Sequence, residues 1–120
     1  MLENSNKLVF SKIIDDDIDS SYNYIKDTLE APNVAENLMN ELYDKLNYIK
    51  EKPYSRPLVQ DEFLASLGIR SIRVKNYLIF YNIEENEGDK DNKYINVISF
   101  MYNKRDWINI LKEKIVDEIM

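Results

Sequence analysis

The sequence contains no cysteine and no histidine among its 120 residues. The absence of cysteine excludes disulfides and thiolate chemistry, and without either residue the usual structural zinc ligands are missing. No side chain titrates near neutral pH without help, so acid–base catalysis would need a perturbed carboxylate, lysine or tyrosine. We therefore expect neither a bound metal nor any other cofactor.

Long apolar runs are missing as well. No stretch of about 18 apolar residues occurs, which excludes a transmembrane helix. The first residues, Met1 to Lys7, are polar and lack the apolar segment of a signal peptide. We therefore expect a cytoplasmic protein with no membrane partner. A length of 120 residues fits one domain, residues 1–120, with a single core.

Charge is unevenly distributed along the chain. The net charge of −6 argues against general nucleic-acid binding. Residues 1–52 carry −5 and residues 84–93 carry −3, whereas residues 53–83 carry +2. All four arginines lie after residue 55: Arg56, Arg70, Arg73 and Arg105. We expect one local basic face on an acidic body.

Hydrophobic periodicity predicts a short strand followed by two helices. Residues 8–10 are a brief apolar run typical of a strand, and the three aspartates at 15–17 suit the start of a helix that extends to about Leu29. Pro32 suits the first turn of a second helix, which Pro53 ends. The short link between the two helices predicts an antiparallel hairpin whose apolar face must be buried.

The second half of the chain changes to the period of two that strands show. Apolar and polar residues alternate from Ile69, and Lys75-Asn76 suits a tight turn. Residues 77–83 are apolar or aromatic on both faces, as expected of a central strand. Residues 94–102 form a further predicted strand. The acidic stretch between them, residues 84–93, is predicted to be a solvated loop.

Two further segments complete the predicted order. Residues 53–68 are predicted to be loop with one weak strand near Phe63-Leu64, and Asp106 is predicted to cap a final helix. Helices and strands segregated in this order predict an α+β fold. It comprises an N-terminal strand, an antiparallel helix hairpin, a three- to four-stranded mostly antiparallel sheet and a C-terminal helix.

Three segments resemble toxins of the RelE/ParE superfamily. The sequence GIRSIRVKNYLIFYNI at 68–83 resembles their third and fourth strands, and INVISFMYNKRDWINIL at 95–111 resembles their last strand and the turn after it. The sequence APNVAENLMNELYDKLNYIKEKPYSRP at 31–57 resembles their second helix with the proline and arginine that follow. These matches cover most of the chain in the family's order.

The resemblance implies a growth-inhibiting toxin of the kind that serves in plasmid stabilisation, held inactive in a hetero-oligomer with its cognate antitoxin. One branch of the family cleaves messenger RNA on the ribosome. The ParE-like branch acts on DNA gyrase and lacks the nuclease residues. In the nuclease branch an arginine usually follows the first tyrosine of the strand at 77–81, and here Leu78 stands there. A tyrosine that is catalytic in some members falls on Leu111.

Three residues remain as a possible nuclease site. Arg73 and Arg105 match basic positions of the nuclease branch, and the histidine at the end of its last strand falls on Tyr102. Two cations can bind a phosphate, but cleavage also needs a proton-transfer group. The ParE-like branch is therefore favoured, and a catalytic site is not expected. The alternatives are a ribosome-dependent messenger RNA endonuclease using these three residues, and a degenerate, non-toxic module that only binds the antitoxin.

Five residues are candidates for partner binding: Arg73, Lys75, Lys104, Arg105 and Trp107. Arginine and tryptophan are favoured at interfaces, although solvated arginines and a tryptophan packed on the sheet edge are competing interpretations. An acidic antitoxin tail is expected to bury the apolar groove between helix hairpin and sheet and to cover the basic face. Arg56 and Arg70 are expected to be structural, each pairing with an acidic group.

Overall fold

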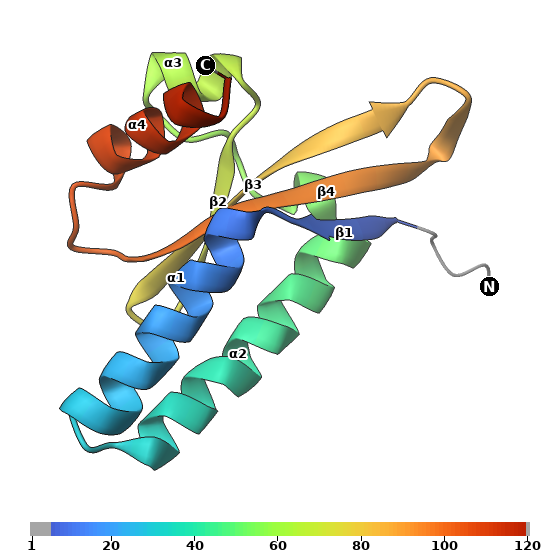
Figure 1. The fold of residues 1–120 in the computed structure, drawn as a ribbon. Helices are drawn as coiled ribbons and strands as arrows, with labels where there is room; N and C mark the ends of the chain where they lie inside the picture. Colours follow the sequence, from blue (N-terminus) through green and yellow to red (C-terminus); the bar gives the residue numbers. More distant parts are fainter. Residues whose placement is uncertain (1–5, 120) are drawn as a thin grey trace.

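A four-stranded sheet forms the centre of the computed structural model, which describes residues 6–119, and helices cover both of its faces (Figure 1). The strand order is β1-β4-β3-β2. Strand β1 (Lys7–Phe10) is parallel to β4 (Asp89–Tyr102). Strands β4, β3 (Tyr77–Asn86) and β2 (Arg70–Val74) are antiparallel neighbours. The predicted α+β class is thereby confirmed.

Helix α1 (Lys12–Asn23) begins earlier than the sequence predicted. Its N-cap is Ser11, whose Oγ accepts a hydrogen bond from the amide of Ile14 at 3.2 Å and donates one to the carbonyl of Ile98 at 2.8 Å. A serine hydroxyl satisfies a free first-turn amide as well as a carboxylate does. The cap is therefore Ser11 and not an aspartate, whereas Asp15 lies in the first turn, near the positive end of the helix dipole as predicted.

The helix hairpin follows the prediction more closely. Helix α1 continues into a π-helical turn, Tyr24–Thr28, and α2 (Pro32–Glu51) begins with its proline in the first turn. The hairpin packs on one face of the sheet and forms a core with β2, β3 and β4. Fully or almost fully buried members of this core are Ile14, Leu38, Ile49, Val74, Ile79, Val97 and Phe100.

A second core lies on the opposite face of the sheet. Two helices cover it: α3 (Glu62–Ser66) and α4 (Trp107–Ile119). Its buried members are Val59, Leu64, Ile69, Phe80, Met101, Leu111 and Ile115. Helix α3 replaces the weak strand predicted at this place, because Asp61 caps it by accepting a hydrogen bond from the amide of Leu64 at 3.0 Å. Five residues are too few to show a helical period.

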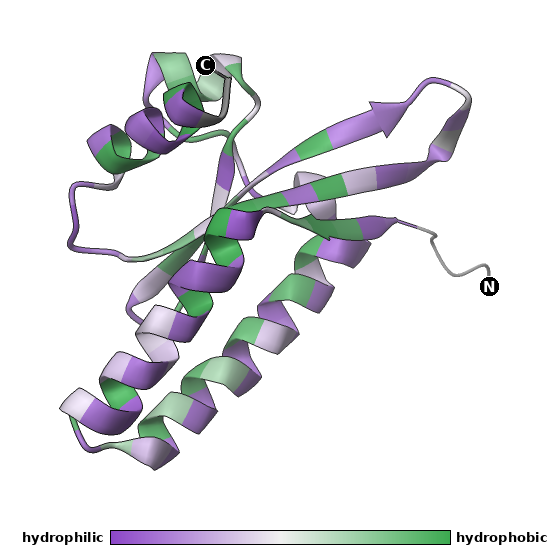
Figure 2. Ribbon diagram, viewed as in Figure 1, coloured by the Kyte–Doolittle hydropathy of each residue, from purple (hydrophilic) through white to green (hydrophobic). Residues whose placement is uncertain are grey.

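Residues 84–93 are not the loop that their composition predicted. Strand β3 runs to Asn86 and β4 starts at Asp89, so only Glu87 and Gly88 form the turn. The resulting ribbon projects beyond the body, and its tip is mainly hydrophilic (Figures 1 and 2). A two-stranded ribbon with water on both faces needs no apolar face. The sequence at 84–93 therefore lacks the alternation of apolar and polar residues by which a strand is recognised. The tight turn at Lys75-Asn76 is confirmed.

Candidate functional site

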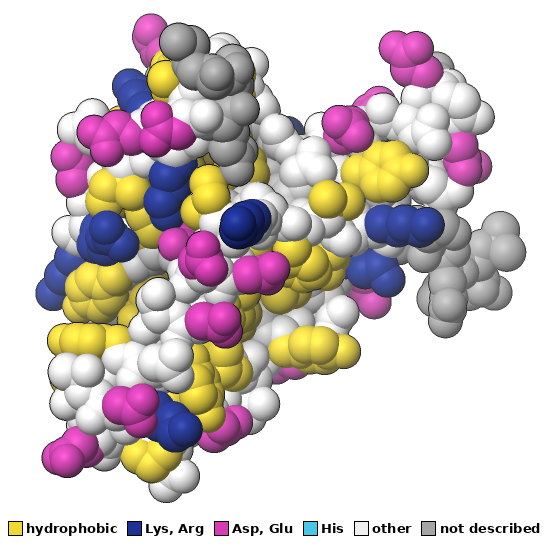
Figure 3. All heavy atoms as spheres, viewed as in Figure 1, with side chains coloured by type: hydrophobic (Ala, Val, Ile, Leu, Met, Phe, Trp, Pro, Cys, Tyr) yellow, Lys and Arg dark blue, Asp and Glu magenta, His cyan; other side chains and the backbone are white. Residues whose placement is uncertain are grey.

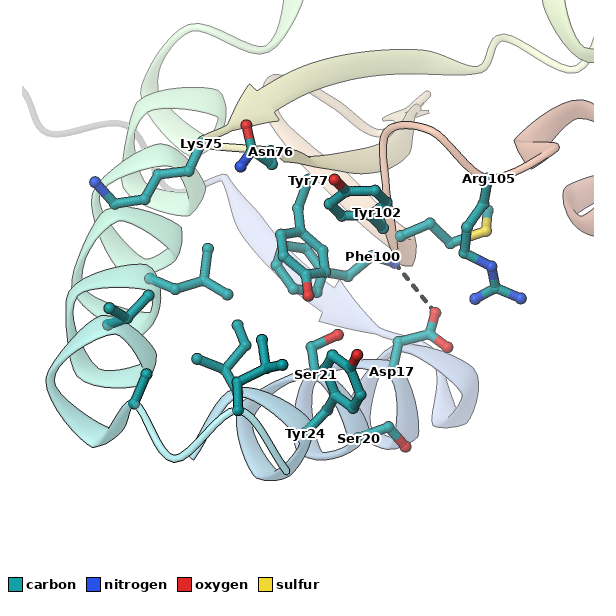
Figure 4. A pocket seen from close by; sticks show the side chains of 16 residues that line it. Asp17, Ser20, Ser21, Tyr24, Lys75, Asn76, Tyr77, Phe100, Tyr102 and Arg105 are labelled. Carbon is teal, nitrogen blue, oxygen red and sulfur yellow. Dashed lines mark hydrogen bonds between the residues drawn. The ribbon is translucent and has the colours of Figure 1, made fainter. Parts of the chain in front are cut away.

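A groove of about 810 Å³ opens between the helix hairpin and the end of the sheet (Figure 4). Helices α1 and α2 and the link between them supply an apolar wall, while β3 and β4 supply the other side. The apolar lining consists of Ile25, Leu29, Ala31, Val34, Leu38, Phe100 and Met101. Leu29 and Val34 are each 54% exposed, so the groove presents an open apolar wall.

Aromatic rings form the floor of the groove where β3 begins and β4 ends. The ring of Tyr77 stacks on Phe100 with centroids 4.7 Å apart and meets the ring of Tyr102 edge-on at 5.6 Å. Burial raises the pKa of the Tyr77 phenol above its ordinary value. Tyr102 is 37% exposed and completes the rim (Figure 4). The floor therefore offers apolar rings with hydroxyl edges rather than a charged catalytic centre.

Two cations stand on the rim of the groove. Lys75 comes from the β2–β3 turn and Arg105 from the turn that follows β4, and both are exposed. Within residues 6–119 neither forms an ion pair, since the ion pairs found there join Lys112 to Asp61 and Lys114 to Asp17. These two charges are therefore available to anionic groups of a partner.

Irregular backbone borders the same groove. The π-helical turn at Tyr24–Thr28 contributes lining residues, and Glu30, between two further ones, has a φ of 51°. Lys75 on the opposite rim has a φ of 53°. Left-handed backbone at a residue with a Cβ costs about 1 kcal/mol or more, and such features concentrate at functional sites. Because these features lie together around the groove, they support its choice as the candidate functional site.

The predicted basic face is divided between the two faces of the sheet. Side chains alternate along β2, so Arg73 lies opposite Ile72 and Val74, on the face that α4 covers. Arg73 and Lys104 are exposed, but neither lines the groove. Figure 3 shows several lysines and arginines on the side where β4 leads into α4, with acidic side chains beside them and further basic side chains elsewhere in the view.

The structure clarifies the roles of three residues that the sequence left open or predicted differently. The indole of Trp107 packs on Phe80 with centroids 5.0 Å apart, which supports the packing interpretation of this tryptophan. Arg56 donates to the carbonyl of Ser71 at 3.4 Å, and Arg70 donates to the Arg56 carbonyl. Within residues 6–119 neither arginine pairs with an acidic group, contrary to the prediction.

Two positions of the nuclease branch, Leu78 and Leu111, lie in the second core. Leu78 is half-buried there, opposite Met101 on β4, and Leu111 is fully buried. Tyr102, the remaining candidate for proton transfer, lies on the groove face instead. Sequence reasoning missed Asp17 and Lys114, which meet at the edge of the groove, because 97 positions separate them.

Comparison with known proteins agrees with this architecture. The family model for the ParE toxin of the type II toxin–antitoxin system parDE matches residues 8–107, from β1 to the start of α4. The solved structure titled "Chromosomal ParDE TA system from P. aeruginosa" shares the fold with a TM-score of 0.62 and 12% sequence identity. That match covers 83% of this chain and 98% of the other. Among curated protein sequences none matches. Because the family model spans most of the sequence, the chain belongs to the ParE family of type II toxin–antitoxin toxins.

Proposed function

We propose that this ParE-family chain inhibits bacterial growth by poisoning DNA gyrase, and that an antitoxin neutralises it by filling the groove. The observation that carries the choice of target is the pair of leucines at two positions where the nuclease branch has its residues. Leu111 is fully buried in the core under α4 and Leu78 is half-buried there, and neither side chain can bind a phosphate or transfer a proton. Both gyrase and the alternative target, the ribosome, would make the protein cytoplasmic.

Proton transfer is the step that the chain is least equipped to perform. General acid–base catalysis contributes about two to four powers of ten in rate. Tyr102 is a phenol next to another phenol, and Asp17, the carboxylate in the same groove, is already hydrogen-bonded to Ser99 and Phe100. Arg105 lines the groove whereas Arg73 does not, so the two cations are not gathered in one pocket that could clamp a phosphate. This separation favours a binding poison over an endonuclease.

The groove supports the antitoxin part of the proposal. Its exposed aliphatic wall suits the apolar side of a segment that folds on binding. Lys75 and Arg105 suit acidic groups on that segment. Arg73 is exposed on the other face, so an antitoxin that covers it as well must wrap around the β2–β3 turn.

The decisive experiment separates gyrase from the ribosome as the target. Purified protein is added to gyrase and plasmid DNA, and supercoiling and trapped cleaved DNA are measured. We expect inhibited supercoiling or accumulated cleavage, and in cells a DNA-damage response while bulk translation continues at first. Immediate translation arrest with codon-phased messenger cuts would assign the protein to the nuclease branch.

A growth assay tests the toxin and antitoxin assignments together. Induction of the chain alone in bacteria should stop colony formation, and co-expression of the antitoxin encoded beside it should restore it. Unchanged colony counts on strong induction would instead favour a degenerate module that only binds the antitoxin.

A further inference from the structure

Asp17 and Arg105 line the same groove, yet within residues 6–119 they form no ion pair. The carboxylate of Asp17 is occupied on both oxygens. Its Oδ2 accepts hydrogen bonds from Ser99 Oγ at 2.7 Å and from the amide of Phe100 at 3.1 Å. Its Oδ1 lies 3.1 Å from Nζ of Lys114. The acid is therefore held at the edge of β4 and neutralised there.

The lysine that holds it comes from the other side of the sheet. Lys114 belongs to α4, and its Nζ also lies 3.4 Å from Ser99 Oγ, whose residue is fully buried. The side chains of Lys114 and Asp17 are 25% and 15% exposed, so water screens this pair less than a pair on the open surface. Figure 4 shows the Arg105 side chain directed to the α1 side of the groove, where Asp17 lies.

We propose that Lys114 is a positioning residue for the groove: by holding Asp17, it leaves the Arg105 guanidinium open to a carboxylate of the partner. Without Lys114, Oδ1 of Asp17 loses its cation. Arg105 shares the groove with it, and a guanidinium readily forms two parallel hydrogen bonds with a carboxylate. The rim would then lose one of its two open cations.

The charge of the molecule makes this cation important. The whole chain carries −6, so an acidic partner is repelled at long range and depends on local cations for its contact. Lys75 and Arg105 are the cations that line the groove. The identification of the partner as an acidic antitoxin segment rests on the proposed function. The proposal that Asp17 pairs with Arg105 once Lys114 is removed is independent of that function.

The first test measures how open Arg105 is, with no partner present. The probe is phenylglyoxal, and mass spectrometry of peptides gives the modification rate of each arginine, with exposed Arg73 as internal reference. In Lys114→Met, Arg105 should react about two- to five-fold more slowly, the range expected for one partly exposed ion pair. The double variant Lys114→Met with Asp17→Asn should restore the rate, because an amide offers Arg105 no charge.

Lys112→Met is the matched control. It removes the same charge from the same helix and breaks an ion pair of similar length, 3.0 Å to Asp61, which does not touch the groove. Arg105 should react at the wild-type rate in this variant. Equal slowing in both lysine variants, or no recovery in the double variant, would show that Lys114 only fastens α4 and would overturn the proposal.

The second test follows the affinity of the co-purified antitoxin's C-terminal peptide by calorimetry. Affinity should fall about two- to five-fold in Lys114→Met, remain unchanged in Lys112→Met and recover in the double variant. If Arg105 reactivity follows this order but affinity does not, the partner makes no use of the guanidinium and that half of the proposal fails. If no peptide binds even the wild type, the antitoxin assignment fails, whereas the phenylglyoxal rates still decide the role of Lys114.

Discussion

At the scale of single residues, Tyr102 and Arg105 make the binding and nuclease functions distinguishable. Tyr102→Phe removes one hydroxyl and keeps the ring that meets Tyr77 edge-on. We expect growth inhibition by this variant to stay within about two-fold of wild type. A tyrosine whose ring serves in packing loses little function when only its hydroxyl is removed. Colony counts after graded induction measure the effect. Abolished toxicity would support proton transfer by Tyr102.

Arg105→Ala is the companion variant. It removes an exposed cation from the rim of the groove, so toxicity or antitoxin binding should weaken more than in Tyr102→Phe. Lys104→Ala removes the neighbouring exposed charge, which does not line the groove, and serves as the control. Equal effects of the two alanine variants would indicate that only the overall charge of this turn matters.

Tyr81 provides a residue-scale prediction about pH. Its side chain is fully buried, its hydroxyl donates to the carbonyl of Pro53 at 2.9 Å, and burial raises its pKa from 10.0 to about 12. A folded-state pKa above the unfolded value favours the neutral phenol in the folded state. The stabilisation is complete below pH 10 and is lost as the pH rises towards 12.

Urea unfolding at a series of alkaline pH values measures this loss. The unfolding free energy of wild type should fall more steeply between pH 10 and 12 than that of Tyr81→Phe, which has no phenol to ionise at this position. Tyr43→Phe is the control, because Tyr43 is 67% exposed. Parallel curves for wild type and Tyr81→Phe would contradict the assigned pKa.

At the scale of elements, α4 covers the face of the sheet that carries the second core. Leu111 is fully buried against this face, whereas Val116 on the same helix is 46% exposed. Leu111→Ala should lower the unfolding free energy by about 2–5 kcal/mol because it leaves a cavity. Val116→Ala should change it by less than about 0.5 kcal/mol. Thermal and urea unfolding of both variants checks this, and a small effect of Leu111→Ala would mean that α4 is only loosely packed.

Elements also differ in how much of them was predictable from local sequence. The hairpin of α1 and α2 and the turn at Lys75-Asn76 follow from periodicity, proline placement and turn chemistry, all of which act within a few residues. Helix α3 and the ribbon tip at 84–93 were mispredicted. Helix α3 is too short to show a helical period. The ribbon tip is solvated on both faces, so its apolar and polar residues do not alternate.

At the scale of the whole molecule, net charge governs how a partner approaches. The chain carries −6, so the proposed acidic antitoxin segment would be repelled at distances beyond contact, whereas Lys75 and Arg105 would attract it locally. Salt at physiological strength shortens the screening length to about 8 Å and weakens the distant repulsion more than the contact. The association rate constant should therefore rise with moderate salt in stopped-flow measurements. A steep fall would mean that local cations dominate the approach.

The sequence by itself determined the α+β class and the order of most elements, because periodicity is a local property of the chain, and its short motifs pointed to the ParE family. It also pointed to Arg105 and Lys75, since both flank strand ends. The sequence did not predict how the basic residues are distributed over the surface of the fold. Strand alternation together with register places Arg73 on the face that carries the second core, and the turn after β4 places Arg105 at the groove.

Only the tertiary structure decided which residues share a site. Leu111 lies on the apolar stripe of the last helix in the sequence, and the packing of α4 decides that this stripe is buried against Phe80 and Met101 in the second core. Asp17 reads as one of several helix carboxylates, yet the edge of β4 and Lys114, 97 positions away, fix its role beside Arg105. Contacts between distant segments depend on how two faces of a sheet are covered, and no local pattern encodes that arrangement.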